Sequence, residues 1–279
     1  MKKLFYKIIP LAYGKYFNIY SIFSKKKATR KVFNFFCTVR KGKVLPQQQE
    51  YLENAKKEQI SIAKHTIQTY HWPGEGQTIL LVHGWESNTF RWRNLIKKLQ
   101  EKKYNIVSFD APAHGYSSGK YLHVPLYAEV VQEMIRLHTP KQLIGHSLGG
   151  MTILYNDYIN QSTSIEKIVT IGSPSEFYKL MDNYRSILQF NNRVLKSLEA
   201  HIKDRFGFTV IEFSTTKYVQ TNIKKGLLFH DKLDKIAPYE DSVSVHKNWK
   251  GSKLITTEGL GHSMHQENVN NQIIEFLKA

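Results

Sequence analysis

Short apolar runs recur along most of this chain, and amphipathic segments separate them. Strands are predicted where residues alternate in polarity or form short apolar runs, near 60–62, 67–70, 78–82, 105–109, 142–145, 167–171, 226–230 and 253–257. Between most of these runs, apolar residues recur every three or four positions, which predicts helices, including a closing one at 267–277. Strands that alternate with helices indicate an α/β fold with a mainly parallel sheet and helices on both faces.

Residues 174–225 interrupt this alternation, because the stretch is too long for a simple crossover between two strands. It contains apolar residues at helical spacing, namely Leu180, Tyr184, Leu188, Leu195, Leu198 and Ile202. The pattern therefore predicts a helical insertion at about 174–225 within a domain that spans 56–279. Residues 1–55 precede the first predicted strand and form an N-terminal extension.

The charge of the chain is concentrated in this extension. The formal net charge is +17, and residues 1–49 hold twelve Lys or Arg and no acidic residue. Residues 50–279 carry 28 basic and 23 acidic residues, so this part of the chain is nearly balanced. The basic excess is a property of the extension and not of the domain that follows it.

The extension has apolar residues at helix-like spacing with lysines between them: Phe5, Ile8, Ala12, Tyr16, Ile19 and Phe23. One interpretation is a helix that makes peripheral contact with an anionic membrane through residues 1–49. Another is a helix packed on the body of the protein, which Pro10 and Gly14 favour because they interrupt a regular amphipathic helix. Nucleic-acid binding is not expected, since no recognised motif accompanies the lysines.

Several properties bear on where the protein resides. No run of eighteen apolar residues is present, so no transmembrane helix is expected. Lys7 and Pro10 interrupt the apolar start, and no small-residue cleavage site follows, so a signal peptide is not expected. The single Cys37 excludes an intramolecular disulfide. These features predict a cytoplasmic protein, and the basic extension leaves association with a membrane open.

The most informative motif is G-x-S-x-G at residues 145–149, with Ser147 at its centre. It lies between a strand-like run at 142–144 and a helix-like run at 151–158. A serine on such a strand-to-helix turn takes strained backbone angles, and glycines at the flanking positions leave room for the turn. The turn exposes the serine hydroxyl to a base and a substrate.

Four further motifs surround this serine in a fixed order. Upstream are a buried strand that runs into a His-Gly turn at 79–85, and D-x-P-x-H-G-x-S at 110–117. Downstream, an apolar strand ends in a loop that carries Asp231 and Asp234, and a later strand ends in the glycine-flanked His262. The order Ser, then acid, then His matches that of hydrolases with a nucleophile elbow.

With these motifs, the chain resembles the α/β-hydrolase superfamily, in particular serine esterases, lipases and thioesterases with a small helical cap. The resemblance covers roughly residues 56–279. It implies the α/β-hydrolase fold, with the insertion at 174–225 as a cap over the active site. One position departs from the family pattern: Ala113 occupies the place of the first glycine in the usual D-x-P-G-H-G-x-S.

The resemblance also implies a catalytic triad. Ser147 needs a base, and His262 can take its proton and later protonate the leaving group. The acid orients the imidazole and stabilises its charged form. Family spacing places this acid four residues before a proline, and Asp234 precedes Pro238 by four. Asp231 is the alternative acid, and otherwise caps the loop.

The tetrahedral intermediate needs two backbone N–H donors. The family pattern assigns them to Leu148, which follows the nucleophile, and to Trp85, which follows the His-Gly turn. Candidates for the substrate pocket are His83, Trp85, His146 and Phe177. Each also has a structural interpretation, since His83 can brace its loop and the other three can belong to the packing.

The motifs together predict a serine hydrolase that cleaves small-molecule carboxylic esters through an acyl-enzyme, without a metal or organic cofactor. A serine nucleophile argues against dehalogenases and epoxide hydrolases, which use Asp at this position in this fold. An acyltransferase or a thioesterase on the same triad remains an alternative. A catalytically silent α/β-hydrolase that acts as a binding protein is a third one.

Overall fold

A computed structural model describes residues 2–279, with side chains from residue 8 onward. The side chain of Phe5 therefore lies outside the described part of the chain. The chain divides into two compact units. One comprises Val39–Ser175 and Thr215–Ala279, and the other joins the N-terminal segment up to Thr38 to Glu176–Ser214.

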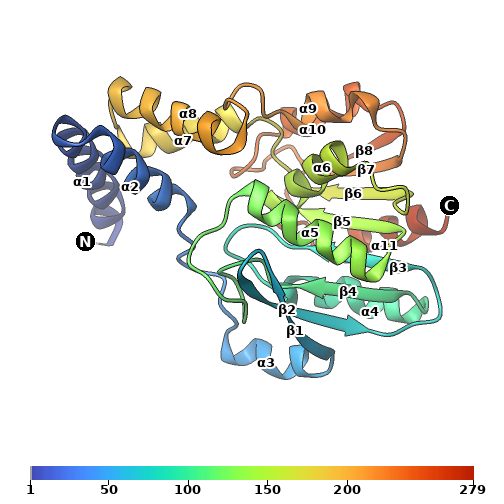
Figure 1. Ribbon diagram of the computed structural model, residues 1–279. Coiled ribbons are helices and arrows are strands. Elements are labelled where there is room, and N and C mark those ends of the chain that lie inside the picture. The colour runs from blue at the N-terminus through green and yellow to red at the C-terminus, as the bar shows by residue number, and fades with distance from the viewer. Residues whose placement is uncertain (1) are drawn as a thin grey trace. The chain divides into compact units, whose positions relative to one another are not determined.

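The first unit is built on a single eight-stranded sheet (Figure 1). Its strands are β1 (Lys56–Ile62), β2 (His65–Trp72), β3 (Thr78–Val82), β4 (Asn105–Phe109), β5 (Gln142–His146), β6 (Lys167–Ile171), β7 (Lys225–Asp231) and β8 (Ser252–Thr257). Their order is β1-β2-β4-β3-β5-β6-β7-β8. Strands β3 to β8 pair in parallel, whereas β2 pairs antiparallel with both of its neighbours, β1 and β4. The mainly parallel sheet predicted from the sequence is confirmed.

Helices cover both faces of this sheet, as Figure 1 shows. The helices of this unit are α3 (Pro46–Glu53), α4 (Arg93–Glu101), α5 (Val124–His138), α6 (Leu148–Asn160), α9 (Thr215–Tyr218), α10 (Tyr239–Asn248) and α11 (Glu267–Lys278), with 3₁₀ turns at Thr89–Trp92 and Val219–Thr221. Strand β3 shows how the two faces arise, because successive side chains of a strand point to opposite sides. Ile79 and Leu81 join a core with α4 and α11, whereas Leu80 and Val82 join a core with α5 and α6.

The sheet brings the candidate residues to one edge. Ser147 follows β5, Asp234 lies three residues after the end of β7, and His262 lies in the loop after β8. These three strands are parallel to one another, so their carboxyl ends lie on the same side of the sheet. Open α/β sheets bind ligands at this edge.

The regular elements described in the second unit are all helices. It consists of α1 (Lys2–Phe23), α2 (Lys25–Cys37), α7 (Phe177–Leu188) and α8 (Asn192–Phe206). The N-terminal helices contact the helices of the predicted insertion: α1 contacts α7 and α8, and α2 contacts α8. Of the insertion expected at 174–225, residues 176–214 belong to this unit, whereas residues 215–225, including α9, belong to the unit of the sheet. None of the described helices is both long enough and apolar enough to cross a membrane.

Candidate active site

Ser147 lies on a strained turn between β5 and α6. Its backbone has φ of 52° and ψ of −122°, a combination that L-residues rarely adopt. The glycines around it are sterically required. A Cβ at position 149 would lie 2.2 Å from the carbonyl oxygen of Val82, and one at position 145 would lie 2.7 Å from the Cα of Gly150. The turn that G-x-S-x-G predicts is therefore present, and it leaves Ser147 only partly buried.

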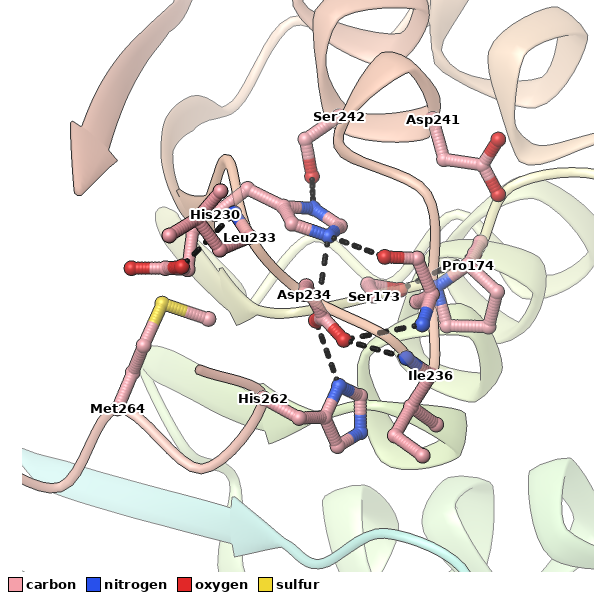
Figure 2. Close-up of polar contacts among 12 residues, drawn as sticks. Ser173, Pro174, His230, Leu233, Asp234, Ile236, Asp241, Ser242, His262 and Met264 are labelled. Atoms are coloured by element: carbon pink, nitrogen blue, oxygen red, sulfur yellow. Dashed lines mark hydrogen bonds and ion pairs between the residues drawn. The ribbon is translucent and has the colours of Figure 1, made fainter. Parts of the chain in front are cut away.

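His262 forms a short hydrogen bond with Asp234 (Figure 2). Its Nδ1 lies 2.7 Å from Asp234 Oδ2, so Nδ1–H donates to the carboxylate and Nε2 is left to accept a proton. The Asp234 side chain is fully buried, whereas that of His262 is 18% exposed. The other carboxylate oxygen of Asp234 accepts the backbone N–H groups of Ile236 and Ala237, at 2.8 and 3.1 Å. The loop itself thus fixes the orientation of this carboxylate.

Asp231, the other aspartate considered from the sequence, has different partners. Its Oδ2 accepts from Thr257 Oγ1 and Leu260 N, both at 2.8 Å, and its Oδ1 accepts from Leu233 N at 2.9 Å. Burial raises the pKa of this carboxyl, but these hydrogen bonds outweigh burial and hold the pKa below its usual value. Asp231 therefore ties the ends of β7 and β8 together. Of the two aspartates, Asp234 is the one that contacts His262.

His262 also contacts the residue that precedes Ser147. The rings of His146 and His262 pack edge to face, with centroids 4.9 Å apart. His146 Nε2–H donates to the carbonyl oxygen of His262 at 3.0 Å. Burial, and then the positive charge of Arg91, lower the pKa of His146 well below its usual value. His146 thus remains neutral and holds the His262 loop beside the turn at Ser147.

The backbone around Ser147 offers donors for a developing negative charge. Helix α6 begins at Leu148, and the first N–H groups of a helix have no partner within the helix. Gly84 packs against the turn, since a Cβ there would lie 3.0 Å from the Cβ of Ser147. Trp85 follows this glycine and is half-buried, with its ring edge to face against His114. The two segments from which the donors were predicted are therefore close to Ser147.

The remaining pocket candidates differ in their surroundings. His83 is fully buried, and backbone groups occupy both ring nitrogens: Nδ1 donates to Gly84 O at 2.8 Å and Nε2 accepts from Ala111 N at 2.9 Å. Burial lowers the pKa of His83 to about 4, so the ring is neutral. These contacts match the structural interpretation of His83. Phe177 belongs to the helical unit, where its ring packs edge to face against Phe213.

Sequence reasoning missed His230, which also contacts the carboxylate of Asp234 (Figure 2). His230 is completely buried at the end of β7, and its Nε2 lies 3.4 Å from Asp234 Oδ2 and 3.0 Å from the carbonyl oxygen of Ala237. Both neighbours are acceptors, so Nε2 carries the proton, and Nδ1 accepts from Ser242 Oγ at 2.6 Å. A polar residue near the end of a largely apolar strand, four positions before the candidate acid, was the available signal.

The loop at 110–117 explains how the chain accommodates its departure from the family pattern. Ala113 has φ of 70°, in the left-handed region where a side chain is disfavoured by about 1–2 kcal/mol. The loop is held from both sides. Asp110 accepts from Tyr70 OH and from the N–H groups of Thr89 and Tyr116, and His114 Nε2 accepts from Glu86 N. The surrounding hydrogen bonds maintain the strained backbone at Ala113.

We therefore expect Ala113→Gly to stabilise the protein. Glycine removes the steric cost of the positive φ, although it increases the entropy of the unfolded chain, so the net gain should be about 0.5–1 kcal/mol. Urea unfolding of both proteins measures this difference. Ala111→Gly is the matched control, because Ala111 is buried in the same loop without a positive φ. This substitution should destabilise the protein. Equal destabilisation by both substitutions would contradict the prediction.

Comparison with known proteins agrees with this architecture. Residues 77–207 match the family model of the alpha/beta hydrolase fold. A pimeloyl-[acyl-carrier protein] methyl ester esterase from Vibrio vulnificus (strain YJ016) is 29% identical over 147 residues, which cover 51% of this chain and 54% of that protein. A Bacillus subtilis (strain 168) protein described as an uncharacterized hydrolase is 22% identical over 75% of this chain and 92% of its own length.

Solved structures extend the similarity to the fold as a whole. An esterase from Exiguobacterium antarcticum superimposes with a TM-score of 0.63 at 17% identity, over 80% of this chain and 100% of that one. The thioesterase domain from the curacin biosynthetic pathway gives a TM-score of 0.60 at 14% identity, over 81% of this chain and 99% of that domain. The chain spans about half the length of the methyl ester esterase that it matches. From its sheet order, the family-model match over residues 77–207 and these neighbours, the chain has the α/β-hydrolase fold.

Proposed function

We propose that this protein is a serine hydrolase that cleaves carboxylic esters, with Ser147 as nucleophile, His262 as base and Asp234 as the acid that orients it. The observation that carries the proposal is the 2.7 Å hydrogen bond between Asp234 and His262, beside the strained turn of Ser147. The relatives named as methyl ester esterases support an ester as the substrate. No metal or organic cofactor takes part in the proposed reaction.

The proposed reaction proceeds in two halves. His262 Nε2 takes the proton of Ser147 Oγ as this oxygen attacks the ester carbonyl, and the N–H groups of Trp85 and Leu148 donate to the resulting oxyanion. The intermediate collapses to an acyl-enzyme, and the imidazolium protonates the departing alcohol. A water molecule then loses a proton to His262 and attacks the acyl group. The imidazolium returns this proton to Ser147 Oγ as its bond to the acyl carbon breaks, which releases the carboxylic acid. Asp234 stabilises the imidazolium in both halves.

Labelling with a fluorophosphonate probe tests the proposal directly. Such a probe phosphonylates a serine only when a neighbouring base activates it. We expect one probe per chain, and peptide mass spectrometry should locate it on Ser147. A chain that stays unlabelled, or one labelled at another serine, would contradict the proposed nucleophile and favour a silent binding protein. Hydrolysis of p-nitrophenyl esters of graded chain length would then define the acyl group.

His230 provides a second test, because its Nε2 contacts the carboxylate that orients His262. His230→Asn keeps a polar group near Ser242 but removes the one that faces Asp234, whereas His230→Gln extends its amide towards Asp234. We expect His230→Asn to lower kcat/KM for p-nitrophenyl acetate by about tenfold to hundredfold, as small displacements of catalytic groups do. His230→Gln should retain most of the activity. Equal activities in the two folded variants would show that this contact does not position Asp234.

A further inference from the structure

Helix α1 has one face fixed by the helical unit. Phe17 and Ser21 are buried on this face, and Gly14 approaches α7 so closely that a Cβ would clash with the carbonyl oxygen of Leu188. Asn18 Oδ1 accepts the backbone N–H of Asn191 at 2.8 Å, and the ring of Phe17 packs edge to face against that of Phe35. These contacts fix which side of α1 points away from the unit.

The opposite face of α1 is apolar although it is exposed. The exposed apolar residues on this side, from position 8 onward, are Ile8, Ile9, Ala12, Tyr16, Ile19, Ile22 and Phe23. The side chains are exposed by 59% at Ile19, 65% at Ile22 and 80% at Phe23. A surface helix normally presents polar residues to water, and a continuous apolar face on such a helix marks an interaction site. We call this side of α1, from Ile8 to Phe23, the apolar face.

Positive charge borders the apolar face. Lys15 is exposed within it, and Lys25, Lys26 and Lys27 are exposed at the start of α2, after Ser24. Lys31 Nζ donates to Tyr16 OH at 2.9 Å, and this bond raises the pKa of the lysine. Residues 1–49 contain no acidic side chain that would offset these charges.

We propose that the apolar face of α1 docks onto the surface of an anionic membrane. Ile19, Ile22 and Phe23 would enter the boundary between headgroups and acyl chains, where amphipathic helices bury their apolar side. Lys25, Lys26 and Lys27 would contact the negatively charged lipid headgroups, which complement them in charge. This surface lies outside the proposed catalytic residues and does not depend on the proposed reaction.

Cosedimentation of the full chain with vesicles tests the proposal. We expect binding to vesicles of phosphatidylcholine with about one third phosphatidylglycerol, and at least tenfold weaker binding to pure phosphatidylcholine. Binding should also weaken by more than tenfold at 1 M salt, where the Debye length is roughly 3 Å. No sedimentation with anionic vesicles at low salt would overturn the proposal.

Variants at exposed positions test the apolar side chains and the lysines separately. Replacing Ile19, Ile22 and Phe23 together with Glu should lower binding at least tenfold. A single Ile223→Glu is the apolar control, since Ile223 is 95% exposed in the other unit, and it should bind like the parent protein. Binding that survives the triple change would overturn the role of the apolar face.

Charge is tested by Lys25, Lys26 and Lys27 changed together to Gln. The affinity for anionic vesicles should fall roughly fivefold for each lysine, and the three factors should multiply. Changing Lys56, Lys57 and Lys102 to Gln removes the same charge from exposed sites in the other unit and should have little effect. Equal losses in both triple variants would indicate attraction by net charge alone and contradict docking through α1.

Size-exclusion chromatography adds a further outcome: a dimer that the Glu variant dissociates, without vesicle binding, would assign the face to a second copy of the chain.

Discussion

Replacing Ser147 with alanine is expected to lower kcat/KM for p-nitrophenyl esters by about 10⁴-fold or more and to abolish labelling by a fluorophosphonate. Removal of the nucleophile of a triad leaves only the small rate enhancement that binding and oxyanion donors provide. Because alanine meets the same backbone strain at φ of 52°, the fold should be retained. Steady-state kinetics and thermal unfolding of the purified variant measure both properties.

Ser162→Ala is a suitable control, since Ser162 lies in a turn after α6 and pairs with Ser164 Oγ. It should leave kcat/KM unchanged. Ser147→Gly adds an independent readout, because glycine tolerates the positive φ. It should be as inactive as the alanine variant but more stable, by about 1 kcal/mol, as expected when catalytic strain is relieved. An alanine variant that keeps more than a tenth of the parent activity would refute Ser147 as the nucleophile.

Much of the sheet could be predicted from the sequence because its strands carry a clear signal. A run such as that at 79–82 is apolar at every position, which suits a strand buried on both faces. The predicted strands all exist, and the flanking glycines of Ser147 are required for steric reasons. These features depend on residues that are near one another in the sequence.

Features that depend on tertiary contacts could not be predicted in the same way. The contact of His230 with Asp234 arises because the loop after β7 folds back, which periodicity does not reveal. The apolar residues of α1 illustrate the same point. The spacing of Ile8, Ala12 and Ile19 indicated a helix, but only the packing of Gly14 and Phe17 determines that this stripe is exposed.

Asp234→Asn is expected to lower kcat/KM by about 10⁴-fold, a magnitude typical of this change in serine hydrolases. The backbone N–H groups of Ile236 and Ala237 would hold the amide oxygen in place of Oδ1, so the amide NH₂ would face His262 Nδ1. His262 Nδ1 would then have to accept a hydrogen bond from the amide, and the ring proton would move to Nε2. A histidine in that tautomer cannot take the proton of Ser147.

Asp231→Asn serves as the matched control, since it makes the same chemical change three residues away. Its amide NH₂ would face the N–H of Leu260, so the hydrogen bond between these residues would be lost. The unfolding temperature should therefore fall, whereas kcat/KM should stay within roughly tenfold of the parent value. The two variants thus separate a tautomer effect on catalysis from an effect on the junction of β7 and β8. If Asp231→Asn were the slower enzyme and Asp234→Asn the less stable one, the acid of the triad would be Asp231, and the hydrogen bond between Asp234 and His262 would have only a structural role.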